Sequence, residues 1–259
     1  MRLQLVAPRT GATWVRLGMQ TFFKQPLALA GLFFMFMALM TIATVVPLLG
    51  LPLAMTLLPS VTLGLMAATK EAAQGRFPMP LMLLSGFRAG RQKTRALLTL
   101  GLLYAIGFMG ALGGSYLVDG GEFARMYLGG QAPSTELLSS GAFQAAMWVF
   151  IGLHLPLSLL FWHAPALVYW QDLPPAKSLF FSIVACVRNL LAMLVFALCW
   201  MGVMVLAVLG VSALSALLDA PGLSGAALMP VMMLVAAMFF TSLYFSYRDS
   251  FEMPDETTV

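Results

Sequence analysis

The 259-residue chain contains 61% hydrophobic and 9% charged residues, with a mean hydropathy of +0.91. Soluble domains average about 45–50% apolar and about 25% charged residues, so this composition excludes a soluble protein. Because one helical span takes about 20 residues, the length accommodates six spans and their loops but no separate soluble domain. We therefore expect an all-α integral membrane protein with a single transmembrane domain over residues 1–259.

The net charge of +4 comes from cations that flank hydrophobic runs rather than from a nucleic-acid-binding motif. Such cations are attracted to anionic lipid headgroups. The sequence therefore predicts membrane lipids as partners, and no nucleic acid.

The first predicted element is an amphipathic helix over residues 12–25, lying in the membrane plane. Thr13, Arg16, Gln20 and Lys24 recur at three- and four-residue steps, and the other side of this helix is apolar. A polar tail that frays is the alternative interpretation. Spans at 26–46 and 51–68 follow, joined by an uncharged link.

A second amphipathic stretch, residues 81–95, leads into a third span at 96–118. Four of the eight residues from Arg88 to Arg95 are cations, and a short loop of this kind stays on the cytoplasmic side. In the span, Gly110 and Gly114 have the GxxxG spacing that lets helix backbones approach closely. The spacing also arises by chance in glycine-rich apolar runs.

Residues 119–142 form a polar outer loop in which several apolar residues indicate a short surface helix. The fourth span, 143–170, contains both histidines together with Pro156 and Pro165. Each proline removes a backbone N–H and loosens the helix beside a histidine. Because an unpaired polar group is costly in lipid, we expect both imidazoles to face other helices.

Asp172 is expected to cap a third amphipathic helix, residues 176–189, with two prolines in its first turn. Spans at 190–218 and 226–247 complete the six. The acidic end, residues 248–259, is polar enough to be disordered.

The spans group into three helical hairpins, each preceded by an amphipathic in-plane helix. Similar cation-to-span junctions, Phe23–Leu29, Lys93–Leu98 and Val187–Ala192, suggest a threefold repeat, although chance similarity of apolar segments is the alternative. This topology leaves Arg125 as the one outer cation among 14. It predicts a multi-pass protein of the bacterial inner membrane with both termini in the cytoplasm.

Four runs of sequence resemble a known family: Gln25–Phe34, Leu117–Arg125, Leu160–Leu167 and Lys177–Ser182. Together they look like an uncharacterised family of proteobacterial multi-pass inner-membrane proteins. More distantly, the arrangement is similar to the membrane domain fused to some glycerophosphodiester phosphodiesterases. The catalytic domain of those enzymes is absent here, so the resemblance implies a fold and a location, without an activity or functional residues.

No catalytic residue, metal site or cofactor is predicted. The chain lacks a P-loop, a nucleophile elbow and an HExxH or CxxC motif, and no Asp, Glu, Lys or Arg lies near the middle of a span. His154 and His163 lie on opposite sides of a straight helix and cannot share a metal ion. With Ser158 they form a candidate intramembrane polar site, which is either structural or functional.

Two functional hypotheses remain, and an enzyme is disfavoured because no nucleophile stands beside a base. The first is a non-catalytic membrane protein that organises lipids or membrane partner proteins. The second is a small transporter or channel whose path is lined by His154, Ser158, His163, Thr41, Thr44 and Tyr104. The cations expected to contact anionic lipid are Arg16, Lys24, Arg88, Arg91, Lys93, Arg95, Lys177 and Arg188.

The topology is tested with reporter fusions. A reporter at residue 130 and one at the C-terminus should give opposite signals, because the first is expected outside and the second in the cytoplasm. Alkaline phosphatase and green fluorescent protein, read in parallel, report these two sides. Identical signals from the two sites would contradict the six-span arrangement.

Overall fold

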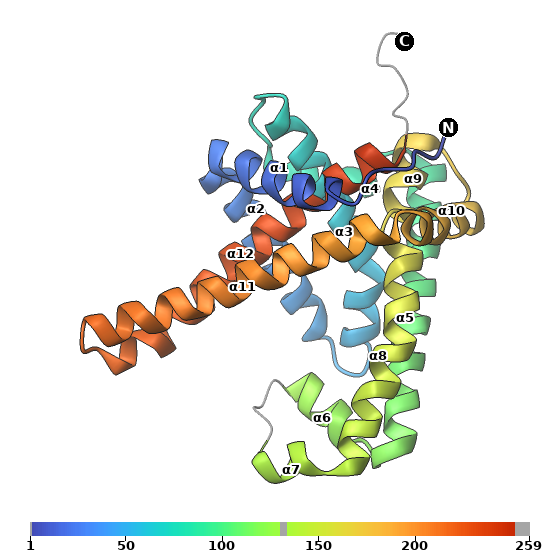
Figure 1. Ribbon diagram of the computed structural model, residues 1–259. Coiled ribbons are helices and arrows are strands. Elements are labelled where there is room, and N and C mark those ends of the chain that lie inside the picture. The colour runs from blue at the N-terminus through green and yellow to red at the C-terminus, as the bar shows by residue number, and fades with distance from the viewer. Residues whose placement is uncertain (1, 130–133, 252–259) are drawn as a thin grey trace.

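A computed structural model describes residues 2–129 and 134–251. These residues are almost entirely helical (Figure 1). The helices are α1 (Thr10–Lys24), α2 (Pro26–Thr44), α3 (Gly50–Ala73), the 3₁₀ helix η1 (Pro80–Leu84), α4 (Ser85–Arg88), α5 (Arg91–Asp119), α6 (Glu122–Gly129), α7 (Thr135–Ser139), α8 (Gly141–Phe161), α9 (Ala164–Gln171), α10 (Pro175–Arg188), α11 (Leu190–Leu217) and α12 (Pro221–Ser250).

Six segments of the described chain are long and apolar enough to cross a membrane, which confirms the expected all-α fold. They pair as the hairpins α2–α3, α5–α8 and α11–α12. The third span begins at Arg91 rather than Ala96, so the cations enter its first turns. The fourth consists of α8 and α9, separated by a break at Trp162 and His163.

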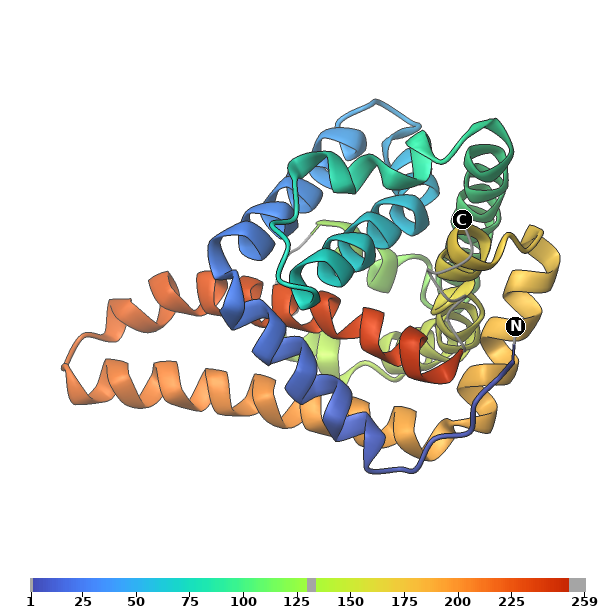
Figure 2. The ribbon, with the colours of Figure 1, turned by 90° about the horizontal axis from the view of Figure 1, so that it is seen from above.

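The three hairpins do not run parallel. Figures 1 and 2 show that α11 and α12 extend obliquely to one side, away from the upright α5–α8 hairpin. The helices α1, α4, α9 and α10 gather at one end of the molecule, called the basic end below, whereas α6 and α7 lie at the opposite end (Figure 1).

Two of the three amphipathic helices form as expected, as α1 and α10. In α1, Trp14, Val15 and Phe22 are buried, whereas Arg16 and Lys24 are exposed. The prediction of one amphipathic helix over residues 81–95 is wrong. That segment contains η1 and the single turn α4, and it breaks at Gly90, whose φ of +90° is a conformation that glycine adopts without steric cost.

The amphipathic segments pack on hairpins that are not their own. The segment η1–α4 packs on α3, and α10 packs on α8 and α9, so each contacts the hairpin that precedes it. In the part of the chain that the structure describes, α1 comes before the first hairpin, and it crosses α11 and α12 of the last hairpin (Figure 2). This cyclic exchange joins the beginning of the described chain to its end.

The segment before α1 is also held in place. The backbone N–H of Gln4 donates to the Ser250 carbonyl at 3.0 Å, and that of Val6 donates to Asn189 Oδ1 at 3.0 Å. The Asn189 side chain donates in turn to the Gln4 carbonyl at 3.1 Å. These bonds contradict the alternative of a fraying N-terminal tail.

The end of α12 differs from the expectation too. Residues 248–250 belong to α12 rather than to a disordered tail, and residues 252–259 lie outside the described part. The Asp249 carboxylate accepts a hydrogen bond from the buried Trp14 indole at 3.0 Å, so it is part of the packing between α1 and α12.

A short helix forms in the predicted loop as α6, which begins just after α5 ends, and its position on the outer side stays a prediction. The Asp119 carboxylate accepts from the N–H groups of Gly121 and Phe123 at 2.8 and 2.6 Å. Phe123 and Tyr127 then contact the Phe150 ring of α8, with centroids 5.2 and 5.1 Å away. Burial raises the pKa of the Tyr127 phenol.

Close helix crossings depend on glycines other than the predicted pair. A Cβ added to Gly18 would lie 2.6 Å from the Ser242 Cβ of α12, and one added to Gly11 would overlap the Ala192 carbonyl of α11. Nothing lies within 4 Å of the corresponding point at Gly110, and at Gly114 that point meets only the side chains of Leu153 and Val149, without any backbone atom. The expected backbone approach at Gly110 and Gly114 is therefore wrong.

Gly18→Ala should destabilise the protein, because the methyl group meets the backbone of α12; such overpacking typically costs about 1–3 kcal/mol. Gly113→Ala is the matched control, since the space around Gly113 is open and alanine favours a helix by about 1 kcal/mol over glycine. The measurement is the thermal unfolding midpoint in mild detergent. A midpoint that falls for Gly18→Ala and not for Gly113→Ala fits the crossing, and equal midpoints would argue against it.

Candidate functional site

The basic end is built around the first turns of α5. Because Gly90 ends the preceding turn, Arg91, Lys93 and Arg95 lie on the spanning helix itself, while Arg88 ends α4. Arg91 and Arg95 are four residues apart and therefore share one face of α5. Both side chains are exposed.

Lys93 joins α5 to the end of α9. Its ammonium group donates to the Tyr169 carbonyl at 2.8 Å and lies 2.9 Å from the Asp172 carboxylate. The expected helix-capping role of Asp172 is wrong. Pro175 disfavours a helical conformation at Pro174, so α10 begins only at Pro175, and Asp172 instead ends α9 with a φ of +54°.

Two surface cavities flank the start of α5. The α9 cavity, of about 880 Å³, lies between α5 and the α9–α10 connection; its lining includes Arg91, Lys93, Arg95, Ala96, Thr99, Val168, Asp172 and Leu173. The α4 cavity, of about 620 Å³, is lined by Phe87, Arg88, Gly90, Arg91, Thr94, Arg95 and Leu98. Arg91 and Arg95 line both cavities. Most of the exposed surface of each cavity is apolar.

A third surface cavity, the α1 cavity, lies between α1 and α11 and measures about 670 Å³. Arg16 and Lys24 line it together with apolar residues that include Phe23, Cys199 and Val203. Lys177 and Arg188 are exposed on α10 and line none of these three cavities.

Five of the cations that line these cavities have no acidic partner within the described ranges: Arg16, Lys24, Arg88, Arg91 and Arg95. An exposed cation above an apolar wall matches the two parts of a phospholipid, its phosphate and its acyl chains. The arrangement therefore has the chemical character that an anionic amphiphile would require.

The candidate intramembrane site has a different character. At the break between α8 and α9, the Ser182 hydroxyl of α10 accepts from the His163 N–H at 3.0 Å and donates to the Leu159 carbonyl at 2.8 Å. These two backbone groups would bond each other in a continuous α-helix. Ser182 thus replaces a missing helical hydrogen bond while the chain bends.

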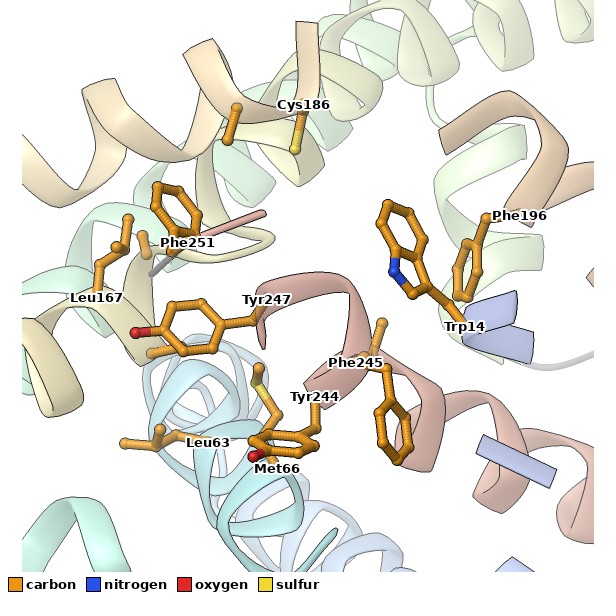
Figure 3. Packing of buried hydrophobic residues seen from close by; sticks show 14 of the residues in the cluster. Trp14, Leu63, Met66, Leu167, Cys186, Phe196, Tyr244, Phe245, Tyr247 and Phe251 are labelled. Carbon is orange, nitrogen blue, oxygen red and sulfur yellow. The ribbon is translucent and has the colours of Figure 1, made fainter. Parts of the chain in front are cut away.

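The His163 ring is buried and faces protein, as expected. Its Nδ1 lies 3.8 Å from the Cys186 sulfur, and its Nε2 lies 3.4 Å from the Ser246 hydroxyl. Figure 3 shows Cys186 in the same packed region as Tyr247 and Phe251 from the end of α12. Burial raises the pKa of the Cys186 thiol to about 12, so this thiol stays protonated near neutral pH.

His154 and Ser158 lie elsewhere. The His154 ring stacks on Phe150 at 5.2 Å and meets the edge of Phe108 of α5 at 5.7 Å. Its Nδ1 is buried without a hydrogen-bond partner. The Ser158 hydroxyl donates to the His154 backbone carbonyl at 2.9 Å. The three residues of the predicted site are therefore not gathered around one ligand position.

The six residues of the predicted transport path are also dispersed. Tyr104 and Ser158 line a small, mostly apolar cavity of about 160 Å³, whereas Thr41 and Thr44 line an apolar, methionine-rich groove between α2, α3 and α12. Neither histidine lines either space.

Sequence reasoning missed two polar residues that hold α10 in place, Ser182 near the middle of the helix and Asn189 just after its last residue. Ser182 follows Ser178 by one helical turn on the buried face of α10, and Asn189 is a polar residue at the junction of two apolar helices. These signals indicate buried polar contacts but do not reveal their partners. No group of three potential metal ligands occurs among the residues that the structure describes.

The six apolar helical segments and the cations at their ends define an all-α multi-pass membrane protein. Over 258 residues the chain is 38% identical to a probable inner membrane protein of Burkholderia thailandensis, covering 97% of this chain and 94% of that protein. The chain belongs to the family of this inner-membrane protein. No family model and no solved structure matches the chain.

Ser182→Ala should destabilise the protein, because it leaves the buried His163 N–H unpaired, at a cost of about 1–3 kcal/mol, and leaves the Leu159 carbonyl with only the weak Cys186 thiol donor at 3.8 Å. Ser178→Ala is the matched control: Ser178 is equally buried on the same helix, but its hydroxyl bonds only to Pro175 in its own first turn. Unfolding midpoints in detergent measure the difference. Equal losses in the two variants would contradict the bridging role.

Proposed function

We propose that the chain is a non-catalytic membrane protein that organises anionic phospholipids at the cytoplasmic surface of the inner membrane. The observation that carries the proposal is the set of three cavities in which exposed cations stand over apolar walls. We favour lipid organisation over catalysis because the described lining of these cavities combines mainly cations and apolar groups.

The oblique α11–α12 hairpin supports the same function. The α1 cavity is lined by residues of α1 and α11, and these two helices cross well away from the start of α5 (Figure 2). A single chain would then hold anionic lipids at separate points around its basic end. Membrane partner proteins, and the likeness to the membrane domain fused to some glycerophosphodiester phosphodiesterases, remain predictions.

Transport has less support. A transporter needs a continuous path, and the residues predicted to line one are divided among separate places. The cavity beside Tyr104 and Ser158 is lined mainly by apolar side chains, and such a lining is unfavourable for a polar solute.

Neutralising Arg88, Arg91 and Arg95 together to Gln should weaken retention of phosphatidylglycerol. Each surface cation contributes about 1 kcal/mol of attraction to anionic lipid, so the triple variant should lose about 3 kcal/mol. Lys93 is left unchanged because it ties α5 to α9. The measurement is the ratio of phosphatidylglycerol to phosphatidylcholine that remains bound after purification from mixed vesicles.

The control variant carries three neutralised acids, Glu252→Gln, Asp255→Asn and Glu256→Gln, which should not lower the ratio. A wild-type protein that retains both lipids equally would refute lipid organisation. A triple variant that keeps the wild-type ratio would refute the assignment to this end of α5.

A further inference from the structure

The α9 and α4 cavities share a wall. Each has one cation of its own, Lys93 in the first and Arg88 in the second, while Arg91 and Arg95 line both. Two anionic groups placed on either side of this arginine pair would each lie near three cations.

We infer that the paired cavities bind one lipid carrying two phosphates, of the cardiolipin type, in which a glycerol bridge joins two phosphatidyl groups. One phosphate lies in each cavity, and the bridge passes over Arg91 and Arg95. The inference rests on the proposed function and names the lipid class and its binding site.

The charges fit this occupant. Four cations line the two cavities and one carboxylate, Asp172, accompanies them, which leaves three positive charges for two phosphates. Lys93 is engaged by Asp172 and Tyr169 and holds the far wall of the α9 cavity. Arg91 and Arg95 are free of such partners within the described ranges, and a guanidinium group matches the geometry of phosphate oxygens.

The apolar surfaces fit as well. Ala96 and Val168 continue the wall of the α9 cavity, and Phe87 and Leu98 continue that of the α4 cavity. One turn beyond Leu98, Leu102 is 55% exposed on α5. Acyl chains descending from the two phosphates would therefore contact apolar side chains on both sides of α5.

A linked pair of phosphates has an advantage over two separate lipids. Two single-phosphate lipids would have to bind independently beside the same two guanidinium groups, each at its own concentration in the membrane. Once one phosphate of a linked lipid is bound, the second is held at a high effective concentration, which can raise overall avidity by about 10²–10⁴.

The test uses the full-length chain in nanodiscs of phosphatidylcholine containing either cardiolipin or phosphatidylglycerol at equal phosphate content. Bound lipid is counted by native mass spectrometry. The wild type is expected to prefer cardiolipin at least about tenfold per phosphate. Equal binding of the two lipids per phosphate would overturn the inference.

Two variants locate the preference. Arg91→Lys with Arg95→Lys keeps the charge but removes the guanidinium geometry, and it should retain phosphatidylglycerol while losing most of the preference for cardiolipin. Arg16→Gln with Lys24→Gln, in the α1 cavity, should keep that preference. A lysine variant with the full wild-type preference, or a loss confined to the α1-cavity variant, would overturn the assignment.

Pyrophosphate serves as the soluble competitor at equal phosphate concentration. It should not displace cardiolipin, because it lacks the acyl chains that contact α5; displacement would instead identify a soluble diphosphate as the occupant and overturn the inference. Retention of both anionic lipids without a preference would defeat this inference alone. If the wild type retains neither cardiolipin nor phosphatidylglycerol in preference to phosphatidylcholine, the proposed function is refuted as well.

Discussion

The contact on which the rest of the structure depends is the crossing of α1 over α11 and α12. Gly11 and Gly18, two helical turns apart, bring the α1 backbone against both helices of the last hairpin, and the Trp14 indole between them is fully buried and bonds to Asp249. Helices in lipid associate through close packing and hydrogen bonds rather than through a hydrophobic force. This crossing supplies both, and it converts three successive hairpins into a cyclic arrangement.

That arrangement determines where the cations lie. The amphipathic segments have their apolar faces packed on neighbouring hairpins, so their polar faces are left at the basic end. The ends of the spans adjoin these faces, and cavities lined by both cations and apolar residues result. The lipid binding that we propose for this end would therefore follow from how the helices pack, together with the distribution of Lys and Arg.

The sequence predicted features that depend on local pattern. Apolar runs marked the six spans, and the polar steps from Arg16 to Lys24 marked the exposed face of α1. It failed where the outcome depended on a distant partner: nothing near Ser182 indicates that its hydroxyl bridges two backbone groups of another helix. The GxxxG spacing pointed to Gly110 and Gly114, whereas a close crossing occurs at Gly18. That crossing depends on the backbone of α12, which lies more than 200 residues away in sequence. The sequence grouped the cations around Arg91 correctly, but their division between two cavities arises from the break at Gly90.

The cyclic exchange also affects biosynthesis. The ribosome synthesises α1 before the six spans, and it synthesises the α11–α12 hairpin, which α1 contacts, after the other four. At about 5–20 residues per second, the time between the synthesis of α1 and that of α12 is on the order of 10–50 s. Throughout this time the apolar face of α1, with Trp14 at its centre, lacks its main partners, α11 and α12. During this interval an amphipathic helix can bury its apolar face at the boundary between headgroups and acyl chains. The same helix would thus serve first as a temporary lipid anchor for the nascent chain and later as the element that completes its fold.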